Sequence, residues 1–427
     1  MYKTIHRCRI CGNTNLKSIV DLGMQNLTGI FPKKNQEVES GPLELVKCVS
    51  EEENLFVCGL VQLRHSFDCK KMYGENYGYR SGLNKSMVEH LTEITKEIKQ
   101  RITFQKGDLV IDIGSNDSTL LRSYGIDGLD YVGMDPTGEK FKKYYPEYVT
   151  LVADFFSKEN LIKIHGGGAK ARAITSIAMF YDLEEPIKFA ADIENVLADD
   201  GIWVMEQSYL PSMLETNSYD TICHEHLEFY CLSQVEWIMK AVGMKVIHVS
   251  LNDANGGSFR VTVAKKNSCY VEDQSVKRVR EYEAKQRFDS LRPYDCFNQN
   301  IENNKKIILD FFAKSKREEK KVYGYGASTK GNVLLQYCGI TFKDIIAIAE
   351  VNEDKFGHIT PGSRIPILSE EEVKKENPDY FIVLPWHFKK SILEKEKEYI
   401  LNSECKFVFP LPELKIIDKN NLLEELQ

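Results

Sequence analysis

Four cysteines near the beginning of the chain have the spacing of a metal site. They are Cys8, Cys11, Cys48 and Cys58. The first pair is a C-x2-C turn followed by glycine, which presents two thiolates to one tetrahedral zinc ion. Nine residues separate the second pair, so an acidic insert would form a loop between its members. We expect a structural zinc site, with His65 and Cys69 as alternative ligands and four unrelated buried thiols as the alternative interpretation.

Acidic residues follow three successive apolar segments of the middle of the chain. The ligand of an open α/β sheet lies beyond the carboxyl ends of its strands. At that edge Asp135 can accept both hydroxyls of a ribose, and Asp154 can reach an adenine amino group. An acid after each of three strands is the pattern of a class I S-adenosylmethionine domain, and the first turn lacks the glycines of a pyrophosphate site. The predicted cofactor-binding residues are Asp112, Gly114, Asn116, Asp117, Asp135 and Asp154.

A His-Glu-His run gives the chain a candidate acid-base group. His224 and His226 flank Glu225, so two imidazoles lie on either side of a carboxylate. Histidine titrates near neutral pH and can therefore take up a proton under working conditions. A surface run or a metal-binding run is the alternative interpretation.

A glycine-rich turn, GYGASTKGN, begins a second nucleotide-type unit at residue 324. Backbone amides, a hydroxyl and an ammonium at a strand-to-helix turn can hold a diphosphate at the helix N-terminus. The residues that we assign to this site are Gly324, Gly326, Ser328, Lys330 and Asn332. NAD is an alternative ligand, because Glu350 follows a later strand. Trp386 stacks on the base or sugar in one interpretation and is a core residue in the other.

The elements that must position these groups are visible in the alternation of apolar strands with helical patterns. Strands are predicted at 109–114, 131–135, 173–180 and 202–208, and again at 321–328, 344–351, 379–386 and 405–411. This pattern favours parallel sheets with helices on both faces. We predict an α/β protein, in which a class I methyltransferase doubly wound sheet is flanked by a small zinc module and a second Rossmann-like C-terminal domain. The predicted domains are residues 1–75, 76–265 and 266–427, with a charged helical connector at 271–316 packed between domains.

The composition of the chain limits the kinds of molecule that we expect it to bind. The chain has 427 residues and a formal net charge of −7, which argues against a nucleic-acid binder and favours a small-molecule ligand. No apolar run is long enough to span a membrane, and the first residues lack the apolar core of a signal peptide. We therefore expect a cytoplasmic protein without a membrane partner, whose eleven cysteines are reduced or bind metal.

Nine motifs give the sequence a resemblance to nucleotide-sugar C-methyltransferases, which methylate 4-keto deoxysugars. In order, they are CRICG, CGLVQLRH, YGYRSG, DIGSND, CHEHLEFY, ANGGSFRV, GYGASTKGN, PGSRIP and LPWHF. They extend over nearly the whole chain, and HEH, NGGS and GASxKGN are the most specific. The resemblance implies zinc in the first module, S-adenosylmethionine in the central domain and the nucleotide of the sugar in the last domain.

The resemblance also implies a reaction. Methyl transfer to a carbon next to a ketone requires removal of the α-proton and stabilisation of an enolate. His226 would be the base, and Glu225 would orient it or touch the sugar, while Tyr79 and His224 complete the predicted catalytic set. The expected partner is a nucleotide-linked sugar, bound by a monomer or small homo-oligomer. An O- or N-methyltransferase and a non-catalytic nucleotide-sugar binding protein are the alternatives.

The chain departs from the family pattern at three places. Cys223 stands where tyrosine is usual, residues 179–181 lack a usual histidine, and Ser118 stands where glycine is usual. The first two changes remove a tyrosine hydroxyl and an imidazole, two donors that could hold the sugar or its enolate. They therefore affect the prediction of the acceptor more than that of the cofactor. Tyr79 or Tyr181 could replace them.

Overall fold

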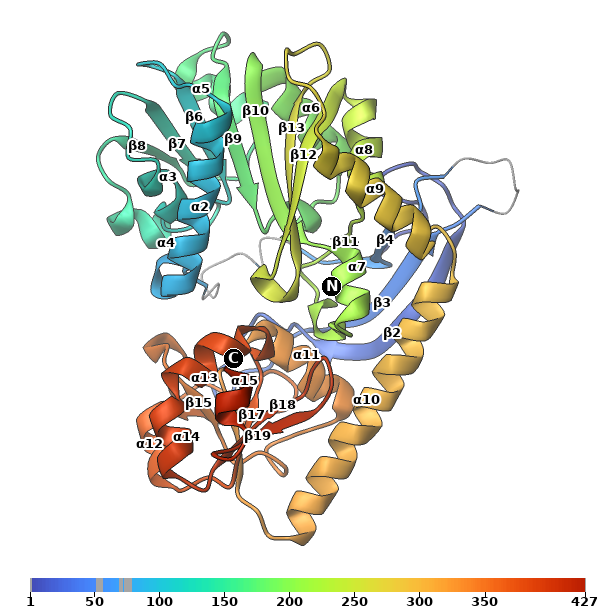
Figure 1. The fold of residues 1–427 in the computed structure, drawn as a ribbon, viewed down its shortest axis with the longest axis vertical. Coiled ribbons are helices and arrows are strands. Elements are labelled where there is room, and N and C mark those ends of the chain that lie inside the picture. Colours follow the sequence, from blue (N-terminus) through green and yellow to red (C-terminus); the bar gives the residue numbers. More distant parts are fainter. Residues whose placement is uncertain (1, 51–56, 69–71, 73–78, 427) are drawn as a thin grey trace.

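The described part of the chain contains three main β-sheets. The computed structural model describes residues 2–50, 57–68, 72 and 79–426. A seven-stranded sheet and a six-stranded sheet lie at opposite ends, and the strands of a four-stranded sheet curve along one side between them (Figure 1). Within the described part of the chain, no helix combines the length and apolar character needed to cross a membrane.

The seven-stranded sheet has the order β12-β13-β10-β9-β6-β7-β8. Its strands are β6 Leu109–Ile113, β7 Asp130–Met134, β8 Val149–Val152, β9 Ala171–Ile177, β10 Leu197–Ser208, β12 Met244–Asn252 and β13 Ser258–Lys265. The first five are parallel, whereas β13 runs antiparallel to both β10 and β12. Because β6 pairs with β7 on one side and β9 on the other, the strand order reverses at its carboxyl end, which is where such sheets bind ligands.

Helices cover both faces of this sheet, as in the doubly wound class I methyltransferase fold that the sequence predicts. They are α2 Lys85–Arg101, α3 Thr119–Ser123, α4 Gly138–Phe141, α5 Lys158–His165, α6 Pro186–Val196 and α8 Leu232–Ala241. Helix α7 Leu210–Glu215 instead belongs to an apolar core with residues of the first part of the chain. On α2, buried Leu91, Ile94 and Ile98 recur at helical spacing and pack with Val204 of β10. Trp203, the preceding residue on β10, faces the opposite way, toward α6 and α8.

The first part of the chain forms a sheet that the sequence analysis did not predict. Strands β2 Leu16–Asn26, β3 Ser40–Cys48 and β4 Val61–Leu63 are antiparallel neighbours, and β1 Lys3–Thr4 pairs with β5 His65–Ser66. The fourth strand, β11 Glu228–Phe229, comes from the central segment and pairs antiparallel with β4. The edge of this sheet therefore belongs to the segment that follows the His-Glu-His run.

The last part of the chain forms the second doubly wound sheet, in the order β16-β15-β14-β17-β18-β19. The strands are β14 Val322–Tyr325, β15 Ile348–Glu350, β16 Ile367–Ser369, β17 Tyr380–Val383, β18 Lys406–Phe409 and β19 Lys415–Ile417. All of them are parallel except β19. The helices are α11 Thr329–Cys338, α12 Glu370–Lys375, α13 Lys389–Lys395, α14 Lys397–Asn402 and α15 Leu422–Glu425.

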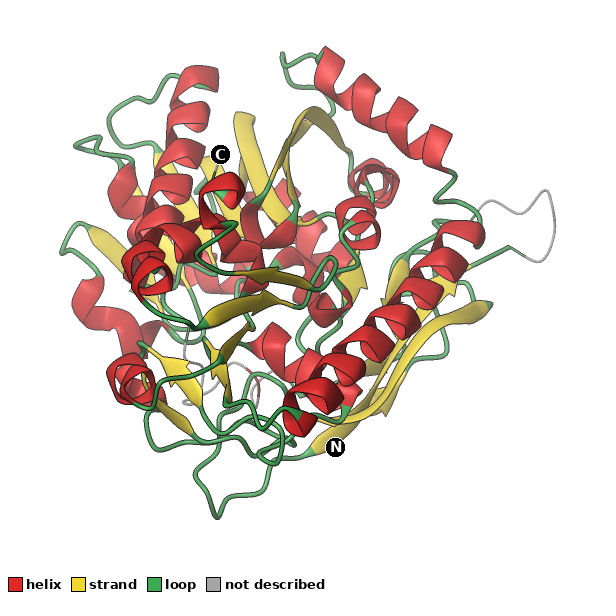
Figure 2. Ribbon diagram, turned by 60° about the horizontal axis from the view of Figure 1, so that its bottom comes forward, coloured by secondary structure: helices red, strands yellow, loops and turns green. Residues whose placement is uncertain are grey.

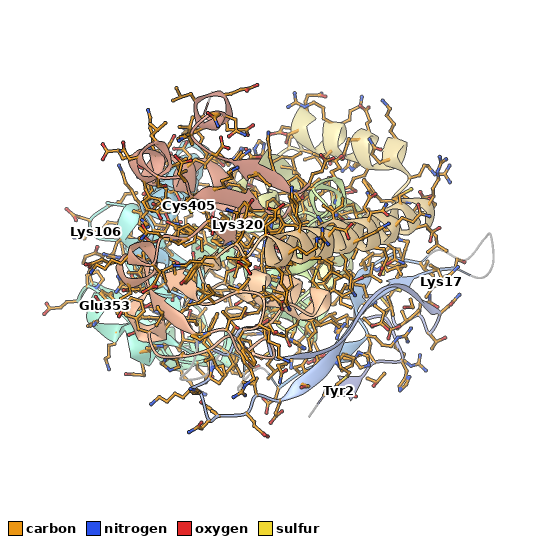
Figure 3. The ribbon with its side chains drawn as sticks, turned by 90° about the horizontal axis from the view of Figure 1, so that it is seen from below. Tyr2, Lys17, Lys106, Lys320, Glu353 and Cys405 are labelled. Atoms are coloured by element: carbon orange, nitrogen blue, oxygen red, sulfur yellow. The ribbon has the colours of Figure 1, made fainter. Side chains whose placement is uncertain are left out.

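Two helices, α9 Gln274–Gln286 and α10 Arg292–Arg317, form the predicted connector. The long helix α10 lies beside β2 (Figure 2). Its buried side chains, among them Phe297 and Ile301, belong to one apolar core with residues of both the four-stranded and the six-stranded sheet. From below, Lys17 of β2 lies on the opposite side of the molecule from Lys106, which precedes β6 (Figure 3).

Candidate functional site

The four predicted cysteines meet at one place. The Sγ atoms of Cys8, Cys11, Cys48 and Cys58 all lie within 4.8 Å of one another. The Sγ atoms of Cys8 and Cys58 are 3.4 Å apart, and those of Cys11 and Cys48 are 3.5 Å apart. Thiolates bound to zinc at about 2.3 Å in a tetrahedron are separated by about 3.8 Å. The donor set therefore fits zinc.

Local structure explains how distant cysteines come together. Cys48 ends β3, and its backbone N–H donates to Leu60 O (2.8 Å), which places Cys58 opposite it. Asn13 donates from Nδ2 to Cys48 Sγ (3.3 Å), a contact of the kind that supports metal-bound thiolates. His65 pairs with Thr4 through β5 and is not part of the cluster, and Cys69 lies outside the described residues.

The turn after β6 has the backbone shape of a ligand cradle. Gly114 has φ +73°, and a Cβ there would lie 3.3 Å from Met179 Cγ. Asn116 (φ 48°) and Ser118 (φ 63°) also adopt left-handed conformations. Ser118 thus keeps the backbone that favours the glycine usual at this position.

Asn116 and Asp117 hold a second segment against this turn. Ser81 N donates to Asn116 Oδ1 (2.9 Å), and Asn116 Nδ2 donates to Tyr79 O (3.1 Å). Gly82 N donates to Asp117 Oδ2 (3.0 Å). Residues 79–82, the described part of the YGYRSG motif, therefore lie on the predicted cofactor turn, with Tyr79 48% exposed.

The three predicted acids have different surroundings. Asp112 is buried and accepts from Thr175 Oγ1 (2.6 Å), and burial raises its pKa to about 7. Asp135 Oδ1 accepts from the N–H and hydroxyl of Thr137, and Oδ2 accepts from Asn116 N (2.8 Å). A carboxylate has about four acceptor positions, so Asp135 keeps one for a ribose hydroxyl rather than two. Asp154 is exposed and bonded to Phe155 N and Asn160 Nδ2.

His226 has the hydrogen bonding of a general base. Its Nδ1 lies 2.9 Å from Thr221 O, and because a carbonyl only accepts, the proton of the neutral ring is on Nδ1 and the lone pair is on Nε2. The ring packs against Tyr181, with centroids 4.3 Å apart. Burial and the charge of Lys330 lower the pKa of His226 to about 3, so the ring is neutral at neutral pH.

The side chains of His224 and Glu225 contact the first part of the chain. His224 is fully buried, with Nδ1 3.4 Å from Thr28 Oγ1 and Nε2 3.3 Å from Gly41 O, and its ring meets the Phe67 ring edge-on. It packs into the four-stranded sheet, and burial lowers its pKa to about 4. Glu225 reaches Gly29, where a Cβ would overlap its Oε1, and burial raises the pKa of its carboxyl. Its Oε2 has no hydrogen-bond partner within the described residues.

The glycine-rich turn after β14 is packed against neighbouring segments and capped by its own serine. Gly324 packs against Ile348, and Gly326 (φ +78°) leaves no room for a Cβ beside Pro385. Ser328 caps α11 by accepting from Gly331 N (3.0 Å).

Lys330 extends from this turn to the central domain. Its Nζ donates to Asn255 O (2.7 Å) in the NGGS motif, and burial lowers the pKa of its ammonium. The sequence analysis placed Lys330 and His226 in separate sites, whereas the charge of Lys330 acts on His226 in the structure.

The other residues predicted around the turn have protein partners. Asn332 is fully buried and donates to Thr28 O (2.8 Å). Glu350, the acid of the NAD alternative, accepts from the backbone N–H groups of Ala327, Val351 and Asn352. Trp386 donates from Nε1 to Asp220 Oδ2 (2.7 Å), which is the core role weighed above.

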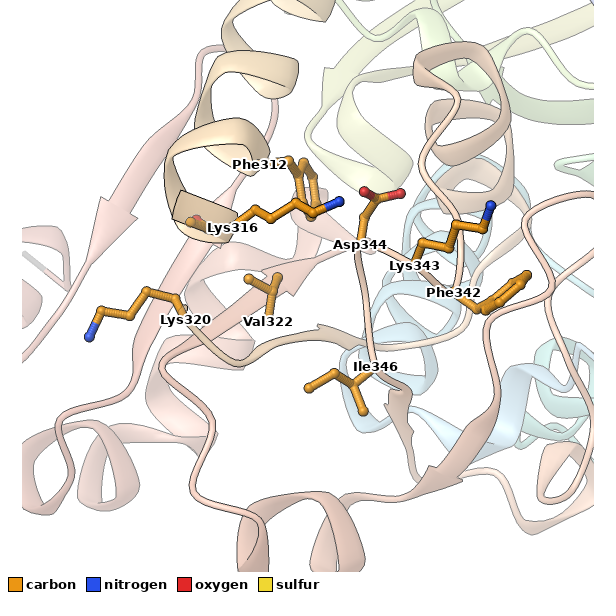
Figure 4. Close-up of a pocket in the computed structure, with 9 residues that line it drawn as sticks. Phe312, Lys316, Lys320, Val322, Phe342, Lys343, Asp344 and Ile346 are labelled. Carbon is orange, nitrogen blue, oxygen red and sulfur yellow. The ribbon is translucent and has the colours of Figure 1, made fainter. Parts of the chain in front are cut away.

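Asp220, Asn255 and His387 lie around Lys330, and of these three the sequence analysis considered only His387, which with Trp386 was a candidate contact for the base or sugar. Asp220 is fully buried, and burial raises its pKa. A Cβ at Gly256, next to Asn255, would lie 3.6 Å from both Trp386 and His387. The NGGS and LPWHF motifs already contained two of these residues, whereas no local signal marks Asp220. A cavity of about 130 Å³ beside α10, lined by Phe312 and Asp344, contains none of the predicted site residues (Figure 4).

Three protein-family profiles match successive parts of the chain. A zinc binding domain matches residues 8–73, a methyltransferase domain matches residues 87–249, and a C-methyltransferase C-terminal domain matches residues 253–412. The C-methyltransferase NovU of Streptomyces niveus is 29% identical over 426 residues, which are 99% of each chain.

Solved structures similar to this chain match less than half of it. The plantazolicin methyltransferase BpumL, in complex with SAH, is 12% identical, with a TM-score of 0.35 over 44% of this chain and 88% of its own. The Burkholderia thailandensis 1,6-didemethyltoxoflavin-N1-methyltransferase is 11% identical, with a TM-score of 0.32 over 44% of this chain and 81% of its own.

Proposed function

We propose that this chain, whose successive segments match a zinc binding domain, a methyltransferase domain and a C-methyltransferase C-terminal domain, is an S-adenosylmethionine-dependent C-methyltransferase whose acceptor is a nucleotide-linked keto sugar. The methyl group is transferred to the carbon next to the ketone, after that carbon has lost a proton. S-adenosylmethionine supplies the electrophilic methyl group. The remaining chemistry belongs to the chain's own residues.

One observation carries the choice of acceptor: the residue proposed for the diphosphate and the residue proposed as the base lie close together. Lys330 comes from the glycine-rich turn, and its charge lowers the pKa of His226. In a nucleotide sugar the reacting ring is attached directly to the diphosphate. A single cleft can therefore hold the diphosphate at Lys330 and the N-terminus of α11 while the sugar lies beside His226.

His226 removes the α-proton through Nε2, because Nδ1 is already used by Thr221 O. The bound diphosphate and the developing enolate bring negative charge close to the ring. Both raise the pKa of His226 again, which makes the ring a stronger base in the complex than in the free enzyme. Tyr181, whose ring lies tilted against the His226 ring, is our first candidate to donate toward the enolate oxygen, and the exposed Tyr79 is the other.

The cofactor is held at the turn after β6. Asp135 accepts a ribose hydroxyl at its remaining position, and the left-handed turn from Gly114 to Ser118 lets the backbone approach the ligand. Asp154 is exposed and bonded to Phe155 N and Asn160 Nδ2 of its own loop, and we assign it a smaller part in cofactor binding than Asp135. Glu350, the acid of the NAD alternative, accepts from three backbone N–H groups and, like Asp135, keeps one acceptor position.

The test is hydrogen exchange at the sugar carbon. The wild-type protein is incubated in deuterated water with a panel of nucleotide 4-keto sugars and S-adenosylhomocysteine in place of the methyl donor. We expect deuterium at the α-carbon, because His226 acts before methyl transfer. His226→Ala should abolish both exchange and methylation, since a general base contributes about 10² to 10⁴ in rate. His6→Ala, at an exposed position, is the control and should leave both rates unchanged.

Two outcomes contradict the proposal. Methylation of a hydroxyl or amine without deuterium in the ring would show heteroatom transfer, which needs no carbon acid. Methylation at the wild-type rate by His226→Ala would remove the histidine from the mechanism and direct attention to Tyr79 and Tyr181.

A further inference from the structure

The C-x2-C turn from Cys8 to Cys11, which we call the zinc knuckle, contains a buried arginine. Arg9 lies between Cys8 and Cys11, and its side chain is 3% exposed. Its Nη1 donates to Leu63 O (2.8 Å) and to Gln62 Oε1 (3.3 Å), and its Nη2 donates to Ser66 Oγ (2.7 Å). The guanidinium is therefore fixed against β4 and β5 from inside the metal-binding turn.

The remaining edge of this guanidinium faces Glu228. Arg9 Nε lies 3.7 Å from Glu228 Oε1 and 3.7 Å from Glu184 Oε2. The side chain of Glu228 is fully buried, and within the described part of the chain neither of its oxygens has a hydrogen-bond partner. A buried carboxylate is costly unless a charge compensates it. The Glu184 side chain is 48% exposed and is therefore hydrated. Of the two acids, Glu228 is thus the one that depends on the cation of Arg9.

Glu228 begins β11, two residues after His226. Within the four-stranded sheet it pairs with Gln62, the residue whose side chain Arg9 also contacts. One residue earlier, Leu227 accepts from Leu63 N (2.9 Å) and donates to Tyr181 O (2.8 Å), so it links the sheet to the ring that packs on His226. The segment that carries His226 is thus attached to the zinc module on one side and to Tyr181 on the other.

We infer that Arg9 is a positioning residue for His226, acting from the zinc knuckle through Glu228 and β11. The inference rests on the proposed function, in which His226 is the base. Without the guanidinium, Glu228 would lose the cation that faces it, and the strand that follows His226 would lose this attachment to the zinc knuckle. A displacement of about 1 Å is enough to slow a reaction by about 10²-fold.

The test compares two arginines of the same knuckle region in the zinc-loaded full-length protein. Arg9→Gln removes the buried charge, and Arg7→Gln is the matched control because Arg7 is exposed and donates to Gly12 O (3.4 Å) within its own turn. The readouts are zinc per chain, S-adenosylmethionine affinity, kcat with the nucleotide 4-keto sugar, and the ring NMR signal of His226. This signal is assigned by its loss in His226→Asn.

For Arg9→Gln we expect retained zinc, cofactor affinity within about twofold of wild type, a shifted or broadened His226 signal, and kcat lower by about tenfold or more. Arg7→Gln should match the wild type in every readout. The double variant Arg9→Gln with Glu228→Gln removes both charges. It should return the His226 signal toward its wild-type position and recover part of kcat, as expected for coupled residues.

An unchanged His226 signal in Arg9→Gln would overturn the inference, and so would a signal that shifts only in proportion to lost zinc. Glu228→Gln provides a second test that leaves the knuckle intact, and it should also move the His226 signal. The NMR readout does not depend on catalysis. If His226→Asn still methylates, the proposed base is wrong while the positioning of His226 by Arg9 is still decided by its signal.

Discussion

At the scale of single residues, His224 and His226 show how neighbouring side chains of one type acquire different roles. The ring of His224 is enclosed by the four-stranded sheet with both nitrogens near protein acceptors or donors, whereas His226 uses only Nδ1 and keeps Nε2. The His-Glu-His pattern places both rings in one turn but cannot tell which of them packs into the four-stranded sheet, because that depends on the pairing of β11 with the distant β4. This is why the sequence analysis named both.

Asp135 and Asp154 allow a matched test of cofactor binding. Asp135→Asn should weaken the binding of S-adenosylmethionine by about tenfold or more, since a hydrogen bond to a charged group contributes about 1.5 to 3 kcal/mol. Asp154→Asn should change affinity by less than about twofold, because this exposed carboxylate is bonded to Phe155 and Asn160 of its own loop. Calorimetry of the two purified variants measures both values. Equal losses in the two variants would show that the exposed acid binds the cofactor after all.

At the scale of elements, the zinc centre holds the four-stranded sheet to the turn that carries Arg9. Cys11→Ser removes one of four thiolates that lie within 4.8 Å of one another, and we expect loss of zinc together with lower stability, because metal binding and folding are coupled. Cys269→Ser, at an exposed cysteine outside the cluster, is the control. Metal analysis and thermal unfolding of both variants give the result. Full zinc occupancy in Cys11→Ser would exclude this residue as a ligand.

Elements with strong local patterns could be predicted from the sequence, and elements made by distant pairing could not. The predicted strand at 131–135 corresponds to β7, and the predicted charged connector corresponds to α9 and α10. Strand β2 was missed because it has no regular apolar alternation: its exposed and buried residues follow each other irregularly around bulges. The division of the chain at residues 75 and 265 stays a prediction.

The same distinction holds for the site. The cysteines could be predicted because their chemistry is marked by residue type and spacing, and the structure brings all four together. The contact of Lys330 with Asn255 could not, because it joins two separate α/β units whose relative placement no local pattern encodes. Sequence reasoning therefore identified the groups but assigned Lys330 and His226 to different sites.

At the scale of the whole molecule, amide side chains attach the C-terminal unit to the N-terminal sheet. Gln336 of α11 accepts from Asn26 N (2.8 Å) and donates to Asn26 O (3.2 Å), in the manner of a backbone pair at the end of β2. Gln25 Nε2 donates to Val333 O, and Asn332 donates to Thr28 O. These bonds supplement the apolar core that α10 shares with both units.

Gln336→Ala should loosen this attachment. Buried backbone groups left without partners cost about 1 to 3 kcal/mol, so we expect a fall of Tm of about 2 to 4 °C and a C-terminal unit that begins to unfold separately. Gln286→Ala, at the exposed end of α9, should change Tm by less than 1 °C. Calorimetry resolves both effects. A single transition at the wild-type Tm would show that the apolar core alone holds the units together.

The place of β11 in the N-terminal sheet has a consequence for synthesis on the ribosome. The four cysteines and strands β2 to β4 emerge first, so metal can be captured early, but β4 has no partner on one side until residues 228 and 229 have been made. During that interval the nascent chain presents an open strand edge, which is a site for pairing with other chains. Completion of this sheet therefore has to wait for the segment that carries His226. The four-stranded sheet and that segment reach their final form in the same step.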